Sequence, residues 1–236
     1  TRRIPEEGIE LLRSGGHTVT VSEKDGVLTR EELLAALKEK EYAAALCLLT
    51  DKIGGAVFDA APKAKIFANY AVGFDNINLD DAKARGVIVT NTPDVVNDTV
   101  AEHTIALMLA ITSRVAEGDR FMRAGKYHGW EPMMLLGADL KGKTLGLLGA
   151  GRIGARVAAI AHQGFGMSVI YYDVRRNEAF EQACGAAFRE NVDSVLKEAD
   201  VVTIHVPLLD STRHLINAER LGLMKKSAYL VNTARG

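Results

Sequence analysis

Residues 143–173 read KTLGLLGAGRIGARVAAIAHQGFGMSVIYYD, and this stretch decides the fold. A short apolar run, Leu145 to Leu148, is typical of a buried strand. It ends in the glycine-rich turn 149–154, and a helical pattern with one apolar face follows. A second strand pattern, Ser168 to Tyr172, leads directly to Asp173. This order of strand, glycine turn, helix, strand and acid predicts a βαβ unit that binds a dinucleotide.

Each glycine of the turn has a physical reason to be there. Gly149 allows the tight turn out of the strand. Gly151 lets the backbone approach a pyrophosphate, because a Cβ atom would block it, and Gly154 lets the helix pack closely on the sheet. The helix start, at Arg152 and Ile153, offers N–H groups and the positive end of the helix dipole to the phosphates.

The residues after the second strand bear on the choice of cofactor. Asp173 stands where an acid bonds the ribose hydroxyls, and its carboxylate repels a 2′-phosphate. Arg175 and Arg176 follow immediately and are able to bind that phosphate instead. The sequence therefore favours NAD(H) and leaves NADP(H) open.

Composition excludes several classes of protein. Of the 236 residues, 47% are hydrophobic and 25% are charged, which is typical of a globular protein, and a net charge of −1 provides no broad basic surface for nucleic acid or membrane. Cys47 and Cys184 lie in or near apolar segments, as free thiols of a reducing compartment do. We expect a cytoplasmic protein with no signal peptide, no membrane-spanning segment and no metal site.

The first part of the chain alternates strand and helix patterns. A capping box, Thr29 with Glu32, predicts a helix over 29–40, and a second helix is expected over 79–85. The expected strands are His17–Val21, Ala43–Leu49, Ile66–Tyr70 and Val87–Thr90. This alternation predicts a parallel sheet covered by helices.

The second part begins with an apolar pattern that predicts one long helix, roughly 97–124, able to bridge two domains or to form an oligomer contact. An irregular segment, 125–142, follows it. Beyond the βαβ unit, further strands are expected over 186–188, 201–205 and 228–232.

Six strings occur together over nearly the whole chain: NYAVGFDNI (69–77), NTP (91–93), LKGKTLG (140–146), GAGRIG (149–154), HVPL (205–208) and VNTARG (231–236). In this order they resemble the D-isomer-specific 2-hydroxyacid dehydrogenase family. Within the family, residues 46–51 and 130–132 look most like those of the glyoxylate/hydroxypyruvate reductases.

The resemblance implies two α/β domains with parallel sheets flanked by helices and a cleft between them. A flavodoxin-like substrate domain is expected over 1–96, and a Rossmann-type NAD(P)-binding domain over 97–236. The family uses a catalytic Arg, Glu and His, and Arg235 matches the arginine. The glutamate and histidine are expected beyond residue 236, and the family's first strand before residue 1. We therefore expect a chain that is incomplete at both ends and inactive by itself.

Reduction of a 2-keto acid needs a hydride donor, a clamp on the carboxylate, polarisation of the ketone and a proton. Arg235 follows a strand at the carboxyl end of a parallel sheet, where ligands bind. Its guanidinium fork suits both the carboxylate and the keto oxygen. The resemblance also implies that the N–H groups of the loop formed by Ala71, Val72 and Gly73 bind the substrate carboxylate.

For other candidate site residues, a second interpretation stays open. Leu49 either walls a small substrate pocket or is a core leucine, and Trp130 either reaches a neighbouring subunit's active site or packs within its own loop. The resemblance implies that His205, Val206 and Pro207 line the cofactor, although His205 suits equally a packed histidine at a strand end. It also implies that Thr233 and Ala234 contact the nicotinamide side.

The predicted function is NAD(P)H-dependent reduction of glyoxylate or hydroxypyruvate to the D-2-hydroxy acid by a homodimer that associates through the cofactor domain. Two alternatives remain open. One is a binding module that senses a dinucleotide without catalysis. The other is a dehydrogenase of the same family for another substrate, such as phosphoglycerate or formate.

Overall fold

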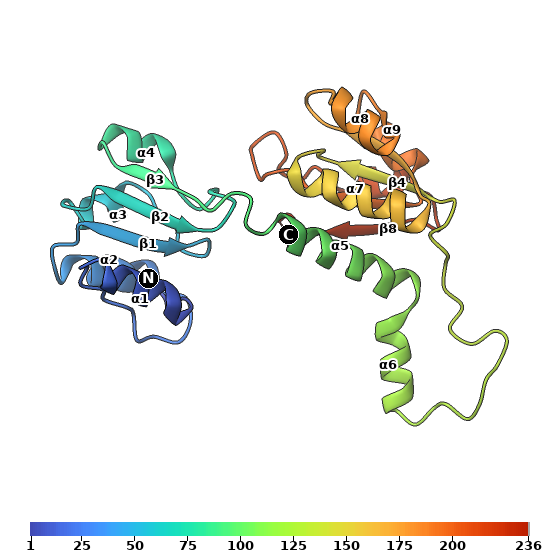
Figure 1. Cartoon of the computed structure of the whole chain (residues 1–236), viewed down its shortest axis with the longest axis horizontal. Coiled ribbons are helices and arrows are strands. Elements are labelled where there is room, and N and C mark those ends of the chain that lie inside the picture. The colour runs from blue at the N-terminus through green and yellow to red at the C-terminus, as the bar shows by residue number, and fades with distance from the viewer. Residues whose placement is uncertain (236) are drawn as a thin grey trace. The chain divides into compact units, whose positions relative to one another are not determined.

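The computed structural model describes residues 1–235 and divides into two compact units, Thr1–Val95 and Val96–Gly236 (Figure 1). Gly236, the last residue of the VNTARG string, lies outside the described residues. Between residues 1 and 235, no helix is both long and apolar enough to cross a membrane.

Unit 1 is built on a three-stranded parallel sheet with the strand order β1-β2-β3. The strands are β1 (Ala44–Leu48), β2 (Ile66–Tyr70) and β3 (Ile88–Thr90), all within one residue of the predicted bounds. The helices are α1 (Glu6–Ser14), α2 (Arg30–Lys38), α3 (Gly55–Ala60) and α4 (Leu79–Ala84). The sequence patterns did not indicate α3.

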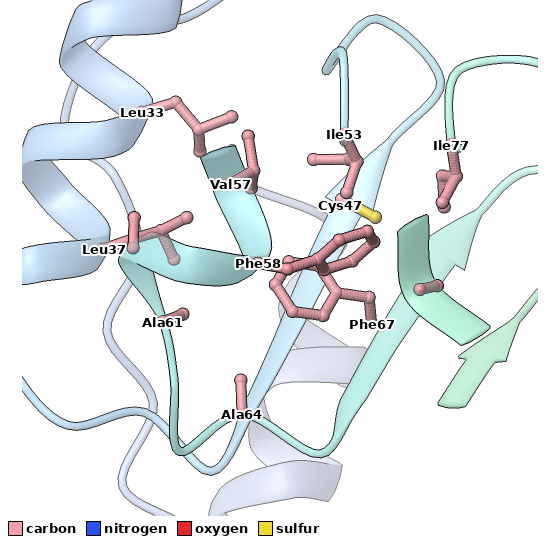
Figure 2. Packing of buried hydrophobic residues seen from close by; sticks show 12 residues of the cluster. Leu33, Leu37, Cys47, Ile53, Val57, Phe58, Ala61, Ala64, Phe67 and Ile77 are labelled. Carbon is pink, nitrogen blue, oxygen red and sulfur yellow. The ribbon is translucent and has the colours of Figure 1, made fainter. Parts of the chain in front are cut away.

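The core of unit 1 lies between the sheet and the helices α2 and α3. Cys47 of β1 and Phe67 of β2 point into it, together with Phe58 of α3 (Figure 2). The rings of Phe58 and Phe67 meet edge to face, with centroids 4.9 Å apart. Cys47 is a free thiol, and burial raises its pKa to about 11, so it stays protonated and serves as a small apolar residue.

Helix α2 begins at the predicted capping box. The Thr29 hydroxyl accepts the N–H of Glu32, and the Glu32 carboxylate accepts the N–H of Thr29 at 2.7 Å. Two of the N–H groups that lack a partner at a helix start are thereby satisfied. The prediction of this helix start is confirmed.

The predicted strand over His17–Val21 is wrong, because residues 17–24 are irregular. A strand pattern produces a strand only where a neighbouring strand supplies ladder hydrogen bonds, and the described sheet of unit 1 consists of β1, β2 and β3. The N–H of His17 instead donates to the carbonyl of Leu12, at the end of α1.

Unit 2 contains a five-stranded parallel sheet with the order β6-β5-β4-β7-β8. Its strands are β4 (Thr144–Leu148), β5 (Ser168–Tyr172), β6 (Ala187–Phe188), β7 (Val201–Ile204) and β8 (Tyr229–Asn232). From β4 the chain adds β5 and then β6 on one side of that strand. It then returns and adds β7 and β8 on the other side of β4. The strand order therefore reverses between β4 and β7, which is where a doubly wound sheet opens a crevice for a ligand.

Helices cover both faces of this sheet. Leu145 and Val201 pack against α5 (Asn97–Thr112) and α7 (Arg152–Phe165), whereas Leu148 and Val202 pack against α9 (Val192–Glu198). Two shorter helices, α8 (Glu178–Cys184) and α10 (Ala218–Leu223), complete the cover. The predicted class, α/β with parallel sheets flanked by helices, is confirmed.

The prediction of one continuous helix over 97–124 is wrong. The helix breaks into α5 and α6 (Val115–Arg123) at Arg114, whose φ of 53° is left-handed. The carbonyl of Thr112 accepts the N–H of Ala138 at 2.9 Å, so a returning segment takes the place of the next helical turn. No glycine or proline marks this break in the sequence, because its cause is a contact distant along the chain.

Candidate functional site

The predicted cofactor residues of unit 2 all follow strands of one parallel sheet. Asp173 comes after β5, the turn 149–154 after β4, residues 205–207 after β7, and residues 233–235 after β8. Parallel strands end at the same edge of a sheet. The structure therefore brings these residues to one edge, with the glycine turn beside the point where the strand order reverses.

Gly149 lies at the centre of this edge. Its φ of 96° is left-handed, and its N–H donates to the carbonyl of Tyr172 at 2.9 Å. An added Cβ would lie 2.9 Å from the carbonyl carbon of His205. Gly149 is required both by the turn and by the close approach of the chain that follows β7.

The next two glycines meet different surroundings. An added Cβ on Gly154 would lie 2.2 Å from the carbonyl oxygen of Gly149, so the first turn of α7 touches the end of β4. An added Cβ on Gly151 would have no atom of the described chain within 4 Å. The first N–H groups of α7, from Arg152 onward, have no acceptor within their own helix. The open space at Gly151 next to this helix end fits a pyrophosphate.

Asp173 is tied to the glycine turn. One carboxylate oxygen, Oδ2, accepts the N–H of Ala150 at 2.7 Å, and the residue is half-buried. This hydrogen bond fixes the carboxylate and leaves the second oxygen, Oδ1, to accept from a hydroxyl such as that of a ribose. The sequence placed Asp173 after its strand, but it did not indicate this bond.

Arg176 is engaged elsewhere. Its Nε and Nη2 donate to the two carboxylate oxygens of Glu181 on α8, each at 2.8 Å, and the hydroxyl of Tyr171 also donates to Glu181 at 2.9 Å. The Glu181 side chain is only 15% exposed. The Arg176 guanidinium holds the pKa of the Glu181 carboxyl below its ordinary value. Sequence analysis missed Glu181. Arg175, which precedes Arg176 in the chain, is exposed.

His205 directly follows β7 and is partly buried. Its Nε2 contacts the hydroxyl of Thr203, which is fully buried. Burial lowers the pKa of His205 to about 4, so its imidazole is neutral at pH 7. Val206 and Pro207 continue the same edge. His205 can therefore form a wall or a hydrogen bond there, but it does not supply a proton at neutral pH.

A turn at the end of β8 presents residues 233–235. The side chain of Asn232 accepts the N–H of Ala234 at 2.9 Å and donates to the carbonyl of Arg235 at 2.6 Å. The Thr233 hydroxyl lies 2.9 Å from the hydroxyl of Thr104 on α5, a residue that sequence analysis missed. A pocket of about 520 Å³ lies between this turn and the first part of α5.

The predicted substrate residues, unlike the cofactor residues, lie on separate segments of the chain. Ala71, Val72 and Gly73 follow β2 in unit 1, and all three are half-buried. Leu49 follows β1 and is 51% exposed, so it does not belong to the core of unit 1. Trp130, in the irregular segment of unit 2, is 81% exposed and is not packed within its own loop.

Gly151, the N-cap of α7, and Gly154, in its first turn, predict different effects of substitution. Gly151→Val should leave the thermal unfolding midpoint nearly unchanged but weaken NADH binding roughly tenfold or more, because its side chain would fill the space of the pyrophosphate. Gly154→Ala should lower the unfolding midpoint, since overpacking costs about 1–3 kcal/mol. Calorimetric titration with NADH and differential scanning calorimetry of both variants check this. Unchanged NADH affinity in Gly151→Val would show that the pyrophosphate does not bind in this space.

Comparison with known proteins agrees with this geometry. Residues 105–236 match the family described as D-isomer specific 2-hydroxyacid dehydrogenase, NAD binding domain. The whole chain is 46% identical to a glyoxylate reductase from Thermofilum pendens, of which it spans 69%. It is 47% identical to a glyoxylate reductase from Aeropyrum pernix, of which it spans 70%.

Solved structures give the same result. A protein from Thermus thermophilus matches 100% of this chain over 73% of its own, with a TM-score of 0.92 and 40% identity. The D-lactate dehydrogenase of Aquifex aeolicus, solved with NAD and lactic acid, matches 99% of the chain over 68% of its own, with a TM-score of 0.85 and 32% identity. The chain belongs to the D-isomer-specific 2-hydroxyacid dehydrogenases and contains the NAD-binding domain of that family.

Proposed function

We propose that the protein uses NADH to reduce a small 2-keto acid, glyoxylate or hydroxypyruvate, to the D-2-hydroxy acid. The observation that carries this proposal is Arg235, held on a turn at the same sheet edge as the glycine turn and Asp173. A dinucleotide-binding edge with a guanidinium beside it suits an anionic substrate that accepts a hydride. The glyoxylate reductases that the chain resembles over its full length support the choice of substrate.

The residues at the edge fit NAD(H). We assign the pyrophosphate to the N–H groups of Arg152 and Ile153 above Gly151, and a ribose hydroxyl to the free oxygen of Asp173. His205, Val206 and Pro207 would form the wall after β7, and Thr233 and Ala234 the side near the nicotinamide. Bound NADH would supply the hydride.

Two features support NADH over NADPH. The Asp173 carboxylate, fixed by the N–H of Ala150, would repel a 2′-phosphate. Arg176, a candidate to bind that phosphate, has its fork occupied by Glu181. An arginine paired in this bidentate way has lost its best donors for a second anion.

We assign the substrate carboxylate to the backbone N–H groups of the loop Ala71–Gly73, and the carboxylate and keto oxygen together to Arg235. Leu49 would form an apolar wall. Arg235 would polarise the carbonyl with its guanidinium fork, and we do not assign it as the proton donor. His205 is neutral at pH 7 and does not donate it either. The proton comes from a group other than these two.

We also propose that two copies associate through unit 2. Val115 and Met122 lie seven residues apart on one side of α6, and each is 58% exposed. Figure 1 shows α6 and the segment after it extending away from the sheet of unit 2, and this segment exposes Trp130, Met133 and Leu136. Helix α6 carries two acidic and two basic residues, so a second copy meets no net repulsion there. A second copy would bury this apolar surface.

A cytoplasmic location is part of the same proposal. Cys47 and Cys184 are both buried and free, and free thiols persist in a reducing compartment. Cell fractionation tests this location, and recovery of the protein outside the cytoplasm would contradict it.

The activity is tested on the full protein encoded by the reading frame that contains these residues. NADH oxidation should proceed with glyoxylate or hydroxypyruvate. Arg235→Lys should lower kcat/KM by roughly a hundredfold or more with unchanged NADH affinity, because a lysine keeps the charge but loses the fork. Oxidation of 3-phosphoglycerate in preference would indicate another family substrate. NADH binding without turnover of any 2-keto acid would instead indicate a sensing module.

Glu181→Gln predicts a change in cofactor preference. The amide keeps an acceptor for Tyr171 but releases the charge that holds Arg176, so NADPH affinity should rise roughly tenfold while NADH affinity stays unchanged. Fluorescence titration with both cofactors measures the ratio. Adding Arg176→Ala to the variant should abolish the gain. An unchanged ratio in Glu181→Gln would show that this ion pair has no part in selectivity.

The proposed association through unit 2 predicts which substitutions disrupt the dimer. Val115→Glu combined with Met122→Glu should convert the dimer to monomer at micromolar concentration, because four carboxylates would then face one another across the contact. Leu11→Glu, at an even more exposed apolar residue of unit 1, should leave the dimer intact. Light scattering after gel filtration gives the masses. A wild-type monomer would refute the proposal, and so would a dimer in both variants.

A further inference from the structure

The loop Ala71–Gly73 is held in an unusual way. All three of its carbonyl oxygens accept hydrogen bonds from the protein. The oxygen of Ala71 accepts the N–H of Thr92 at 2.9 Å, and that of Val72 accepts the side-chain amide of Asn91 at 2.8 Å. The oxygen of Gly73 accepts the side-chain amide of Asn69 at 2.8 Å.

These three bonds determine where the N–H groups of the loop point. In a trans peptide, the carbonyl of one residue and the N–H of the next point in opposite directions. Because the carbonyls of residues 71–73 face their donors, the N–H groups of Val72, Gly73 and Phe74 turn away from them. None of these three N–H groups bonds to an acceptor among residues 1–235. These three successive donors are therefore not used within the described chain and are available to an anion that binds at the loop.

The Asn69 donor is itself rigidly placed. Asn69 and Asn76 are both buried, and their side chains exchange two hydrogen bonds, of 3.1 and 3.2 Å. Asn76 also donates to the carbonyls of Leu48 and Asp51, at 3.2 and 3.1 Å. This network connects the ends of β1 and β2 to the loop. Asn91 differs, since it is exposed on the segment after β3, so replacing it removes little packing.

We propose that Asn69 and Asn91 are positioning residues for the substrate carboxylate, because they hold the carbonyls of Gly73 and Val72 and so direct the loop N–H groups at the anion. The inference rests on the proposed function, in which this loop binds the carboxylate. Donors that are already oriented need no reorganisation when the anion arrives, so they contribute more to binding than mobile ones. A peptide that lost its side-chain partner would rotate freely and offer its N–H less often.

The test uses Asn91→Ala in the full protein, with Asn78→Ala as a matched control. Asn78 is likewise exposed in unit 1, and its side chain accepts the N–H of Asp81 as the cap of α4 and takes no part in the loop hydrogen bonds. Asn91→Ala should raise the KM for glyoxylate and the inhibition constant of oxamate, a carboxylate-bearing analogue, roughly three- to tenfold, as expected for one hydrogen bond. The Kd of NADH should not change. Asn78→Ala should leave all three constants at wild-type values.

A second measurement separates this inference from the proposed function. Amide NMR signals of Val72, Gly73 and Phe74 should shift when oxamate is added to the wild type and shift far less in Asn91→Ala. If the wild type shows these shifts without turning over any 2-keto acid, the positioning role stands and the proposed function fails. If turnover is normal and Asn91→Ala has a wild-type KM, the positioning role is wrong. An equal rise of KM in Asn78→Ala would also overturn it, because the effect would then be one of general stability.

Discussion

Gly154 has no room for a side chain, because the first turn of α7 packs directly on the turn that follows β4. The organisation of unit 2 depends on this close packing. An added Cβ would lie 2.2 Å from the carbonyl oxygen of Gly149, so α7 starts against the end of β4. The same turn is bound on both sides, because Gly149 donates to the carbonyl of Tyr172 and His205 donates to the carbonyl of Leu148. The ends of β5, β4 and β7 are thus joined before any ligand binds. A pyrophosphate would meet N–H groups that are already oriented.

In both units, hydrogen bonds within the protein fix the backbone next to the N–H groups that we assign to an anion. In unit 2, the fold places the first turn of α7 beside open space at Gly151. In unit 1, three donors hold the carbonyls of one loop so that its N–H groups face away from these donors. Anion binding by neutral amides avoids burying formal charge, which is costly without a partner. In the proposed reaction, Arg235 would add the formal charge that polarises the keto group.

Sequence patterns predicted the parts of this structure that depend on neighbours along the chain. The capping box at Thr29, the strands of both sheets and the glycine turn follow from local rules, and they are present. The patterns failed where a distant partner decides: residues 17–21 alternate like a strand but pair with none in the described sheet, and α5 ends because Ala138 binds Thr112. Asn69 and Asn91 escaped notice because no spacing rule relates an amide side chain to the loop carbonyl it holds.

The corner between β5 and α8 holds a second group of residues that we expect to bear on the choice of cofactor, besides Asp173. The hydroxyl of Tyr171 accepts the N–H of Asn177, where α8 begins, and donates to Glu181 one turn later. Glu181 in turn binds Arg176. From sequence, Arg175 and Arg176 were equivalent candidates for a 2′-phosphate. Packing makes them different, because only Arg176 faces a carboxylate that a buried tyrosine holds in place. We therefore expect cofactor selectivity to depend on this packing as well as on the acid at the strand end.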